Sequence, residues 1–246
     1  MPSPYRYCGQ SWRIQIRLHS MVGTFHSPIM GKKEECFSQT RWSGIPSGIE
    51  SMVSFWDLAY VFGAPWDTGE PPSELTGLVK QGKLKPCSVL DIGCGTGTTV
   101  VYLASLGFEA FGLDISRVAV KKAKGTALRH AVSCRFFRLD FTNTSALTSA
   151  GLHTFDVLID NGCYHSLSPI DRDKYEGSLL HVSHRGTVYL LWCFLRDSGS
   201  SYGPPGVDRG EIDDRFSKNF QVLEQRELKA SWRNMLFFQM QRINKQ

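Results

Sequence analysis

The chain lacks the features that would place it in a membrane, in a disulfide-bonded scaffold or around a zinc ion. It contains no run of about eighteen apolar residues, so no segment is long enough to span a bilayer as a helix. Its seven cysteines are scattered, odd in number and free of any Cys-x-x-Cys pair. We therefore expect reduced thiols in a cytosol-like compartment and no bound metal.

A strong excess of positive charge is also missing from most of the chain. The formal net charge is +5, but six basic and three acidic residues precede Met52, so only about +2 remains on the rest. A domain with so little excess charge lacks the basic surface of a nucleic-acid binder. We expect neither nucleic acid nor a membrane among its partners.

Residues 1–51 show no sustained helical or strand period. Their first 33 residues contain no acid, as in organellar presequences, but they lack the amphipathic helical stripe of a presequence. We predict that residues 1–51 form a disordered extension and that one domain spans residues 52–246. A cytoplasmic location is expected, with a mitochondrial one as the alternative.

The rest of the chain is organised around residues 88–97, Ser-Val-Leu-Asp-Ile-Gly-Cys-Gly-Thr-Gly. A short buried strand ends near Asp91, and Gly93, Gly95 and Gly97 follow in a turn without side chains. Such a turn lets a ligand approach the backbone N–H groups at the start of the next helix. A dinucleotide-binding loop would carry its third glycine one residue later, so the spacing indicates another nucleoside.

Strand and helix patterns alternate along the domain. Because only a short connection joins the last two predicted strands, these two must pair antiparallel. The order predicts a Rossmann-like α/β fold with a seven-stranded, mostly parallel sheet, one antiparallel strand and helices on both faces. A short helix and an aromatic loop, residues 52–72, are predicted to form a lid. The predicted strands cover residues 88–91, 109–113, 134–139, 155–159, 187–194, 220–228 and 234–241.

Three of the predicted parallel strands end in an acidic residue: Asp91, Asp114 and Asp160. Because the carboxyl ends of parallel strands meet at one edge of a sheet, these carboxylates are expected to converge. Asp114 lies about twenty residues beyond the glycines, where a carboxylate accepts both hydroxyls of a ribose.

The motif Asp91-x-Gly93-x-Gly95-x-Gly97 resembles the first motif of the class I S-adenosylmethionine-dependent methyltransferases. Two further segments resemble the small-molecule enzymes related to thiopurine, halide/thiol and heterocyclic-toxin methyltransferases. They read Pro-Trp66-Asp-x-Gly-x-Pro71 and Phe155-Asp-x-Leu-Ile-Asp-x-Gly-x-Tyr-His165. The resemblance covers the chain from Ser54 onward and implies methyl transfer from S-adenosylmethionine to sulfur, nitrogen or oxygen of a small molecule.

The resemblance also implies a set of cofactor-binding residues. Trp56 and Trp66 would close over the cofactor and the acceptor, Asp140 would meet the adenine amino group, and the neighbouring Phe141 would cover the adenine ring. The full set expected to hold S-adenosylmethionine is Trp56, Trp66, Asp91, Gly93, Gly95, Gly97, Asp114, Ile115, Asp140, Phe141 and Asp160.

The methyl acceptor is expected beside the end of the fourth strand. His165 is the candidate general base for a phenol, with Asp160 or Asn161 orienting its ring, whereas a thiolate or a halide needs no base. Alternatively, His165 only hydrogen-bonds the backbone. An aromatic wall suited to a flat or sulfur-rich acceptor is predicted from Trp66, Tyr164, Trp192 and Phe194.

Other functions are less compatible with these residues. A nucleic-acid or glutamine amino-methyltransferase would carry Asn/Asp-Pro-Pro-Tyr after the fourth strand, where this chain has Asp160-Asn-Gly-Cys163. A non-catalytic subunit that activates a partner methyltransferase, or a protein methyltransferase, is the alternative. The intact glycines and Asp114 favour catalysis. We expect a small-molecule acceptor, no metal, and a monomer or weak dimer.

Overall fold

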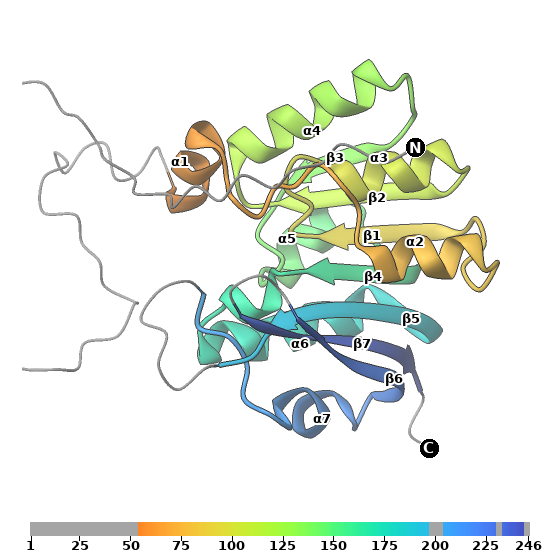
Figure 1. The fold of residues 1–246 in the computed structure, drawn as a ribbon, viewed down its shortest axis with the longest axis vertical. Coiled ribbons are helices and arrows are strands. Elements are labelled where there is room, and N and C mark those ends of the chain that lie inside the picture. Colours follow the sequence, from red (N-terminus) through yellow and green to blue (C-terminus); the bar gives the residue numbers. More distant parts are fainter. Residues whose placement is uncertain (1–53, 197–203, 230–232, 244–246) are drawn as a thin grey trace, which may run out of the picture. The chain divides into compact units, whose positions relative to one another are not determined.

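The computed structural model describes residues 54–196, 204–229 and 233–243. The predicted extension, residues 1–51, lies outside the described residues. The described part forms one seven-stranded sheet in the order β3-β2-β1-β4-β5-β7-β6 (Figure 1). The strands are β1 (Ser88–Ile92), β2 (Glu109–Asp114), β3 (Arg135–Arg138), β4 (Phe155–Asn161), β5 (Ser183–Phe194), β6 (Phe220–Lys229) and β7 (Asn234–Arg242).

The directions of the strands confirm the predicted fold class. The pairs β1/β2, β1/β4, β2/β3 and β4/β5 are parallel. Strand β7 runs antiparallel to both of its neighbours, β5 and β6. The sheet is therefore mostly parallel with one reversed strand, as the short connection between the last two strands requires.

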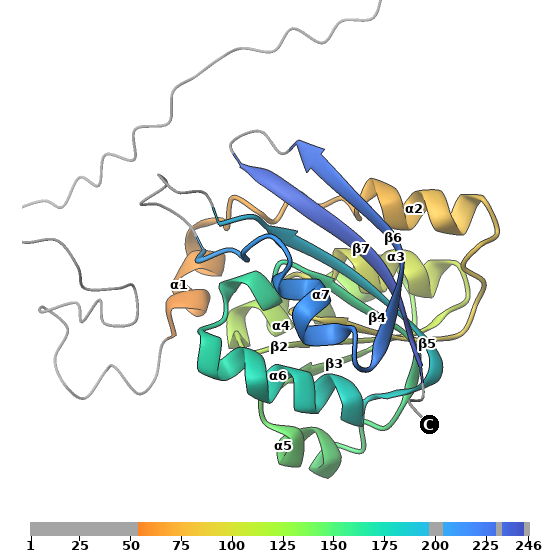
Figure 2. The same ribbon diagram turned by 90° about the horizontal axis from the view of Figure 1, so that it is seen from below.

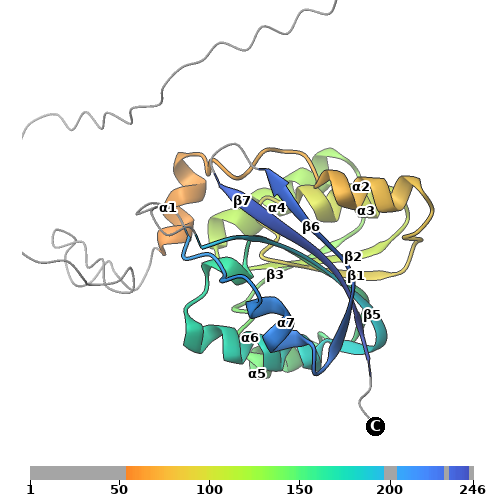
Figure 3. The ribbon, with the colours of Figure 1, turned by 60° about the horizontal axis from the view of Figure 1, so that its bottom comes forward.

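Helices cover both faces of the sheet, as Figures 2 and 3 show. One face packs against α2, α3 and α4, and the other packs against α5, α6 and α7. The helices are α1 (Phe55–Phe62), α2 (Ser73–Lys80), α3 (Thr98–Ser105), α4 (Arg117–Arg129), α5 (Thr144–Ser149), α6 (Pro169–His181) and α7 (Glu211–Phe216), with a 3₁₀ turn, η1, at Tyr164–Ser166.

Each face has its own hydrophobic core because successive side chains of a strand point to opposite sides. In β1, Leu90 and Ile92 join the core under α5, α6 and α7, whereas Val89 joins the core under α2, α3 and α4. Strand β1 is buried on both faces, which explains its almost continuous apolar sequence.

Two details of the fold follow from local interactions. Helix α5 begins at Thr144 because the Asn143 side chain caps it by accepting the N–H of Ala146. Strand β5 starts at Ser183 and bulges away from β4 before pairing resumes at Val188.

The carboxyl ends of β1, β2 and β4 meet at one edge of the sheet. Ile92 pairs with Leu113 of β2 on one side and with Asp160 of β4 on the other. The chain order reverses between β1 and β4, which is where ligands bind in open α/β sheets. The fold therefore brings the predicted acidic residues to the binding edge.

Comparing Gly97, in the loop after β1, with Gly107 separates the effect of packing from that of backbone conformation. Gly97 and Gly107 both have positive φ, 82° and 86°. A Cβ at Gly97 would lie 2.8 Å from Ala123 Cβ and 2.8 Å from the Phe136 ring, whereas at Gly107 the nearest atom would be 4.0 Å away. Only Gly97→Ala should therefore add steric overlap to the backbone strain.

We predict that Gly107→Ala lowers the free energy of unfolding by about 1–2 kcal/mol through backbone strain. Gly97→Ala should lower it by about 2–5 kcal/mol because overpacking is added. Urea unfolding of both variants measures the difference. Equal losses would show that overlap of the new methyl group with Ala123 of α4 and Phe136 of β3 adds no cost to unfolding free energy.

Candidate functional site

The loop after β1 directs several of its own N–H groups to protein acceptors. Gly93 and Cys94 both donate to the carbonyl of Leu113 at 2.9 Å. Gly95 N–H donates to Asp114 Oδ2 at 3.0 Å. These three N–H groups are therefore used by the protein itself. The expectation concerned the N–H groups at the start of the next helix, α3 (Thr98–Ser105), and for those it stays a prediction.

The glycines of this loop are also required by their neighbours. Gly93 and Gly95 have positive φ. A Cβ at Gly93 would lie 2.8 Å from Cys163 Cβ, and a Cβ at Gly95 would lie 2.8 Å from the hydroxyl oxygen of Tyr60. The loop is thus enclosed between the segment after β4 and helix α1.

Asp114 ends β2 beside this loop. Its Oδ2 accepts from Gly95, and its Oδ1 accepts from Ser116 N–H at 2.8 Å. Burial raises the pKa of the carboxyl, although the two N–H donors oppose that rise. Two carboxylate oxygens offer about four lone pairs, so Asp114 retains acceptor capacity for hydroxyl groups.

Asp91 is the least satisfied carboxyl of the site. It is 4% exposed, and no hydrogen bond to its side chain is present among the described residues. Burial, followed by the charges of Asp160 and Asp114, raises the pKa of Asp91 to about 8. A buried carboxyl without a donor is a group that a cationic ligand would stabilise in its charged form.

A shallow pocket of about 250 Å³ opens beside the ends of β2 and β3. Two of the predicted cofactor residues, Ile115 and Asp140, line it. The Asp140 carboxylate accepts from the N–H and the hydroxyl of Thr142 at 2.9 and 2.7 Å, which fixes its orientation. The pocket is lined by Ile115, Arg138, Leu139 and Asp140.

Phe141 does not line this pocket with its ring. The side chain is 3% exposed and packs into the core against Tyr175, with ring centroids 4.7 Å apart. The prediction that Phe141 covers an adenine ring is therefore wrong in this arrangement. The chain turns after Asp140, so Phe141 faces the core while Asp140 stays exposed.

Helix α1 is attached to the start of α4, and Figure 1 shows it at the end of the sheet where β1 and β2 terminate. Asp57 Oδ1 accepts from Ser116 Oγ at 2.6 Å and from Val118 N–H at 3.1 Å. A carboxylate is favoured at a helix N-terminus by the free N–H groups and the dipole. Lys122 of α4 donates to the carbonyl of Tyr60 at 2.6 Å.

Three aromatic side chains contact one another in residues 54–72, the segment predicted to form a lid: Trp56, Tyr60 and the half-exposed Trp66. Trp56 and Trp66 meet edge to face with centroids 5.8 Å apart, and Trp66 Nε1 donates to the Tyr60 hydroxyl at 3.3 Å. Asp67 accepts from Thr96 Oγ1 at 2.6 Å and so joins the lid to the glycine loop. The structure thus brings Trp56 and Trp66 together beside the loop.

Tyr60 and Asp57 were missed by sequence reasoning. Asp57 is the third residue after Ser54 and completes a capping box with it, which is a recognisable helix-start signal. Tyr60 lies four residues after Trp56, on the same side of the helix, so the spacing alone gave a usable hint. Their partners on α4 and on the glycine loop are distant in sequence and left no local signal.

Asp160 supports the turn after β4. Its Oδ1 accepts from the N–H groups of Gly162 and Cys163 at 3.0 and 2.7 Å. Its Oδ2 accepts from Tyr164 N–H at 3.0 Å and from the Tyr175 hydroxyl at 2.6 Å. Burial raises the pKa of Asp160 to about 6. This carboxylate is committed to the protein's own groups, so it shapes the turn.

His165 is buried, and its Nδ1 accepts the backbone N–H of Phe194 at 3.1 Å. Burial, followed by the charges of Arg233 and Arg172, lowers the pKa of His165 to about 3. The imidazole is therefore neutral and its basic nitrogen is engaged. Among the described residues no hydrogen bond joins His165 to Asp160, so the expected pair of base and orienting acid is not formed.

The predicted aromatic wall is also divided. Tyr164 is fully buried in the core under α6 and α7. Trp192 is 2% exposed in the core on the opposite face, where its Nε1 donates to Glu74 at 3.1 Å. Phe194 is half-buried beside His165, and Trp66 belongs to the lid. These four side chains do not form one surface.

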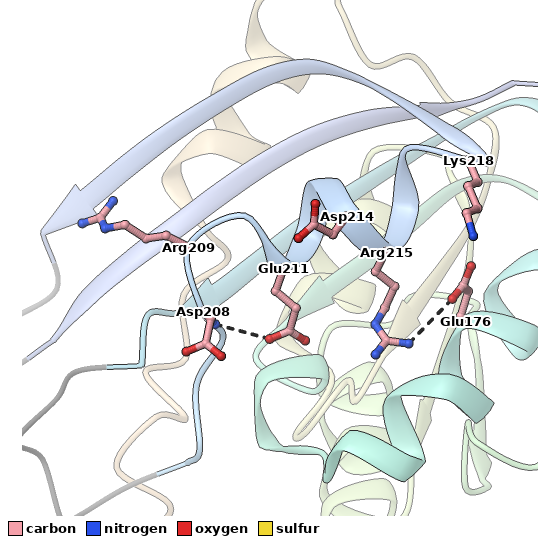
Figure 4. A pocket seen from close by; sticks show the side chains of 7 residues that line it. All are labelled: Glu176, Asp208, Arg209, Glu211, Asp214, Arg215 and Lys218. Carbon is pink, nitrogen blue, oxygen red and sulfur yellow. Dashed lines mark hydrogen bonds and ion pairs between the residues drawn. The ribbon is translucent and has the colours of Figure 1, made fainter.

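A largely buried ion pair joins Arg172 of α6 to Glu211, the first residue of α7. Arg172 donates to both oxygens of Glu211 at 2.7 and 2.8 Å and to the Gly206 carbonyl at 2.7 Å. The Tyr164 hydroxyl donates to Glu211 at 2.9 Å. A second pocket, of about 440 Å³, lies beside this pair (Figure 4) and is lined by Glu176, Asp208, Arg209, Glu211, Asp214, Arg215 and Lys218.

Metal and membrane features were searched in the same described part of the chain. There, no group of three or more His, Cys, Asp and Glu side chains is arranged to hold a metal ion. None of the helices in residues 54–196, 204–229 and 233–243 could cross a membrane.

Comparison with known proteins identifies relatives of this chain. The profile of a methyltransferase domain matches residues 89–185. A 2-heptyl-1-hydroxyquinolin-4(1H)-one methyltransferase of Mycobacteroides abscessus is 32% identical over 161 residues, which are 64% of this chain and 69% of that protein. A probable thiol methyltransferase 2 of Arabidopsis thaliana is 31% identical over 159 residues, 63% of this chain and 68% of that protein.

A solved structure shares the fold. The 1,6-didemethyltoxoflavin-N1-methyltransferase of Burkholderia thailandensis, whose structure contains its substrate and S-adenosylhomocysteine, gives a TM-score of 0.61 at 16% identity. The likeness covers 76% of this chain and 85% of that one.

The groups at the sheet edge suit S-adenosylmethionine. Asp91 is a buried carboxyl with no donor among the described residues, Asp114 has acceptor capacity beyond its two N–H donors, and the pocket that Ile115 lines lies beside the ends of β2 and β3. The domain match and the relatives, of which this chain spans more than two thirds, agree with that chemistry. The chain therefore belongs to the class I S-adenosylmethionine-dependent methyltransferases.

Proposed function

We propose that this methyltransferase acts on a small-molecule acceptor whose nucleophilic atom is ionised before the methyl group is transferred. Sulfur is the preferred nucleophile. The observation that carries the proposal is the convergence of Asp91, Asp114 and the Asp160 turn around the glycine loop, together with the engagement of the candidate base His165, whose Nδ1 accepts from Phe194. The relative from Arabidopsis, a probable thiol methyltransferase, supports an acceptor of this kind.

The cofactor's parts are assigned by chemistry. The Asp114 carboxylate accepts the ribose hydroxyls, Asp91 faces the ammonium group, and Ile115 and Asp140 border the adenine. Gly93, Gly95 and Gly97 leave no room for a Cβ because protein atoms lie 2.8 Å from each such position, so the glycines shape the loop beside which the nucleoside would lie. Trp56 and Trp66 cover the site from the lid. Asp160 acts indirectly because its oxygens hold the turn after β4.

The chain's contribution to catalysis is alignment and exclusion of water. When bound, the cofactor supplies a methyl group on a sulfonium, which is a good leaving group. The residues then need only hold the acceptor in line with that methyl group and keep the site dry. The lid aromatics and the rigid turn held by Asp160 are suited to those two tasks.

His165 is not suited to remove a proton from the acceptor. Its Nδ1 already accepts from Phe194, and burial keeps its pKa near 3. A phenol of ordinary pKa, about 10, would then remain protonated at neutral pH. A thiol, a halide or another acceptor that is anionic without help fits the site better.

Competing functions have weaker support. A non-catalytic subunit has no need of Asp114 or of glycines that are enclosed in this way.

We further propose that the enzyme takes neither nucleic acid nor metal, works as a monomer or weak dimer, and resides in the cytoplasm. The modest net charge of the domain supports the first of these statements.

Asp114→Asn should weaken binding of S-adenosylhomocysteine about 30- to 100-fold, because hydrogen bonds to a charged acceptor contribute about 1.5–3 kcal/mol. Titration calorimetry measures the affinity. Asp208→Asn, a change at an exposed ion pair with Arg196, serves as the matched control and should leave it unchanged. Normal affinity in the Asp114 variant would disprove the ribose assignment.

Cofactor binding should depend on pH through Asp91. Below its pKa of about 8 the carboxyl is protonated, so it must lose a proton to face an ammonium group. Affinity for S-adenosylhomocysteine should therefore rise between pH 5.5 and 7.5, by at most about tenfold per pH unit. In Asp91→Asn the affinity should no longer rise over this pH range. If the affinity depended on pH in the same way in both proteins, Asp91 would not be the group that faces the ammonium.

The pH dependence of turnover should be set by the pKa of the acceptor. With an aryl thiol and an alkyl thiol of different pKa, the midpoint of kcat/KM should move with the pKa of the thiol, because no protein group takes the proton. A midpoint common to both thiols, displaced by His165→Asn, would restore the role of His165 as a base.

A further inference from the structure

We infer that the hydroxyl of Tyr60 is a cofactor-binding group: it donates a hydrogen bond to an oxygen of bound S-adenosylmethionine, on the ribose or on the carboxylate. The inference rests on the cofactor site proposed above and adds to it a residue from the lid helix.

The position of Tyr60 is fixed from three directions. Asp57 attaches α1 to the start of α4, and Lys122 holds the Tyr60 carbonyl at 2.6 Å. Trp66 Nε1 donates to the hydroxyl at 3.3 Å. The hydroxyl oxygen lies 2.8 Å from the point that a Cβ on Gly95 would occupy. The contacts of α1 with α4 therefore hold Tyr60 in place beside the glycine loop.

The hydroxyl has one unused hydrogen-bonding function. It accepts from Trp66, but among the described residues no acceptor for its own O–H is present. Tyr60 is 5% exposed, so bulk water does not readily satisfy that proton. Buried donors without an acceptor cost free energy, and this cost is relieved when a ligand supplies one.

The surroundings identify the ligand's chemistry as an oxygen acceptor. Asp114, the ribose-binding candidate, is near enough to raise the pKa of Tyr60, after the larger effect of burial. The hydroxyl therefore stays protonated at neutral pH and acts as a donor. Ribose hydroxyls that donate to Asp114 can accept from Tyr60, and the cofactor's carboxylate can accept as well.

The test compares Tyr60→Phe with the unchanged full-length chain by titration calorimetry. Loss of one buried hydrogen bond should weaken S-adenosylhomocysteine about tenfold. A second titration uses 5′-methylthioadenosine, which has the ribose and lacks the amino-acid carboxylate. An equal loss with both ligands assigns the acceptor to the ribose, and a loss with S-adenosylhomocysteine alone assigns it to the carboxylate.

The control is Tyr102→Phe in α3, which removes a hydroxyl on another element and should leave both affinities unchanged. Tyr60→Phe keeps the ring but removes the acceptor of Trp66 Nε1, so the melting temperature of each protein is measured with and without ligand, and the rise on adding S-adenosylhomocysteine should shrink in the variant. Parental or tighter affinity in Tyr60→Phe overturns the inference. Failure of the parent chain itself to bind would instead refute the proposed cofactor site.

Discussion

A hydrogen bond from Gly95 N–H to Asp114 Oδ2 joins the loop after β1 to the end of β2. The register of β1 and β2 places the two groups side by side. Gly95 has no side chain, and a Cβ at this position would collide with the Tyr60 hydroxyl. A charged acceptor makes such a bond about twice as strong as a neutral one. The bond therefore sets the shape of the cofactor site before any ligand arrives.

Three carboxylates at one sheet edge would repel one another if all were charged and unsatisfied. The protein gives each a different environment. Asp160 receives three N–H groups and a tyrosine hydroxyl, Asp114 receives two N–H groups, and Asp91 receives no described donor. Their raised pKa values have burial as the common largest cause. The edge can therefore accept a cation at Asp91 while its neighbours keep the backbone in place.

The positions of the strands along the chain and the glycine loop could be predicted because both follow from local patterns: buried runs, turn glycines and acids at strand ends. The directions of side chains at those ends could not. Tyr164 and Phe141 were assigned to the site, yet the turns after β4 and β3 direct them into the core under α5, α6 and α7. Trp192 was also assigned to the site, but it lies within β5 and points into the core on the opposite face. Tyr60 lies beside Gly95, and its carbonyl accepts from Lys122; both residues are more than thirty positions away, so the local spacing from Trp56 could hint at Tyr60 but not at these neighbours.

Helix α1 is held by side-chain hydrogen bonds to α4 and by the lid's contact with the glycine loop. Its outer face carries apolar side chains that the fold leaves exposed, such as Phe55 and Phe62. Residues 54–72 are thus joined to the glycine loop and α4 by polar contacts of single side chains and lie outside the two cores between sheet and helices. A substitution on the outer face of α1 would therefore leave the packing of the sheet unchanged.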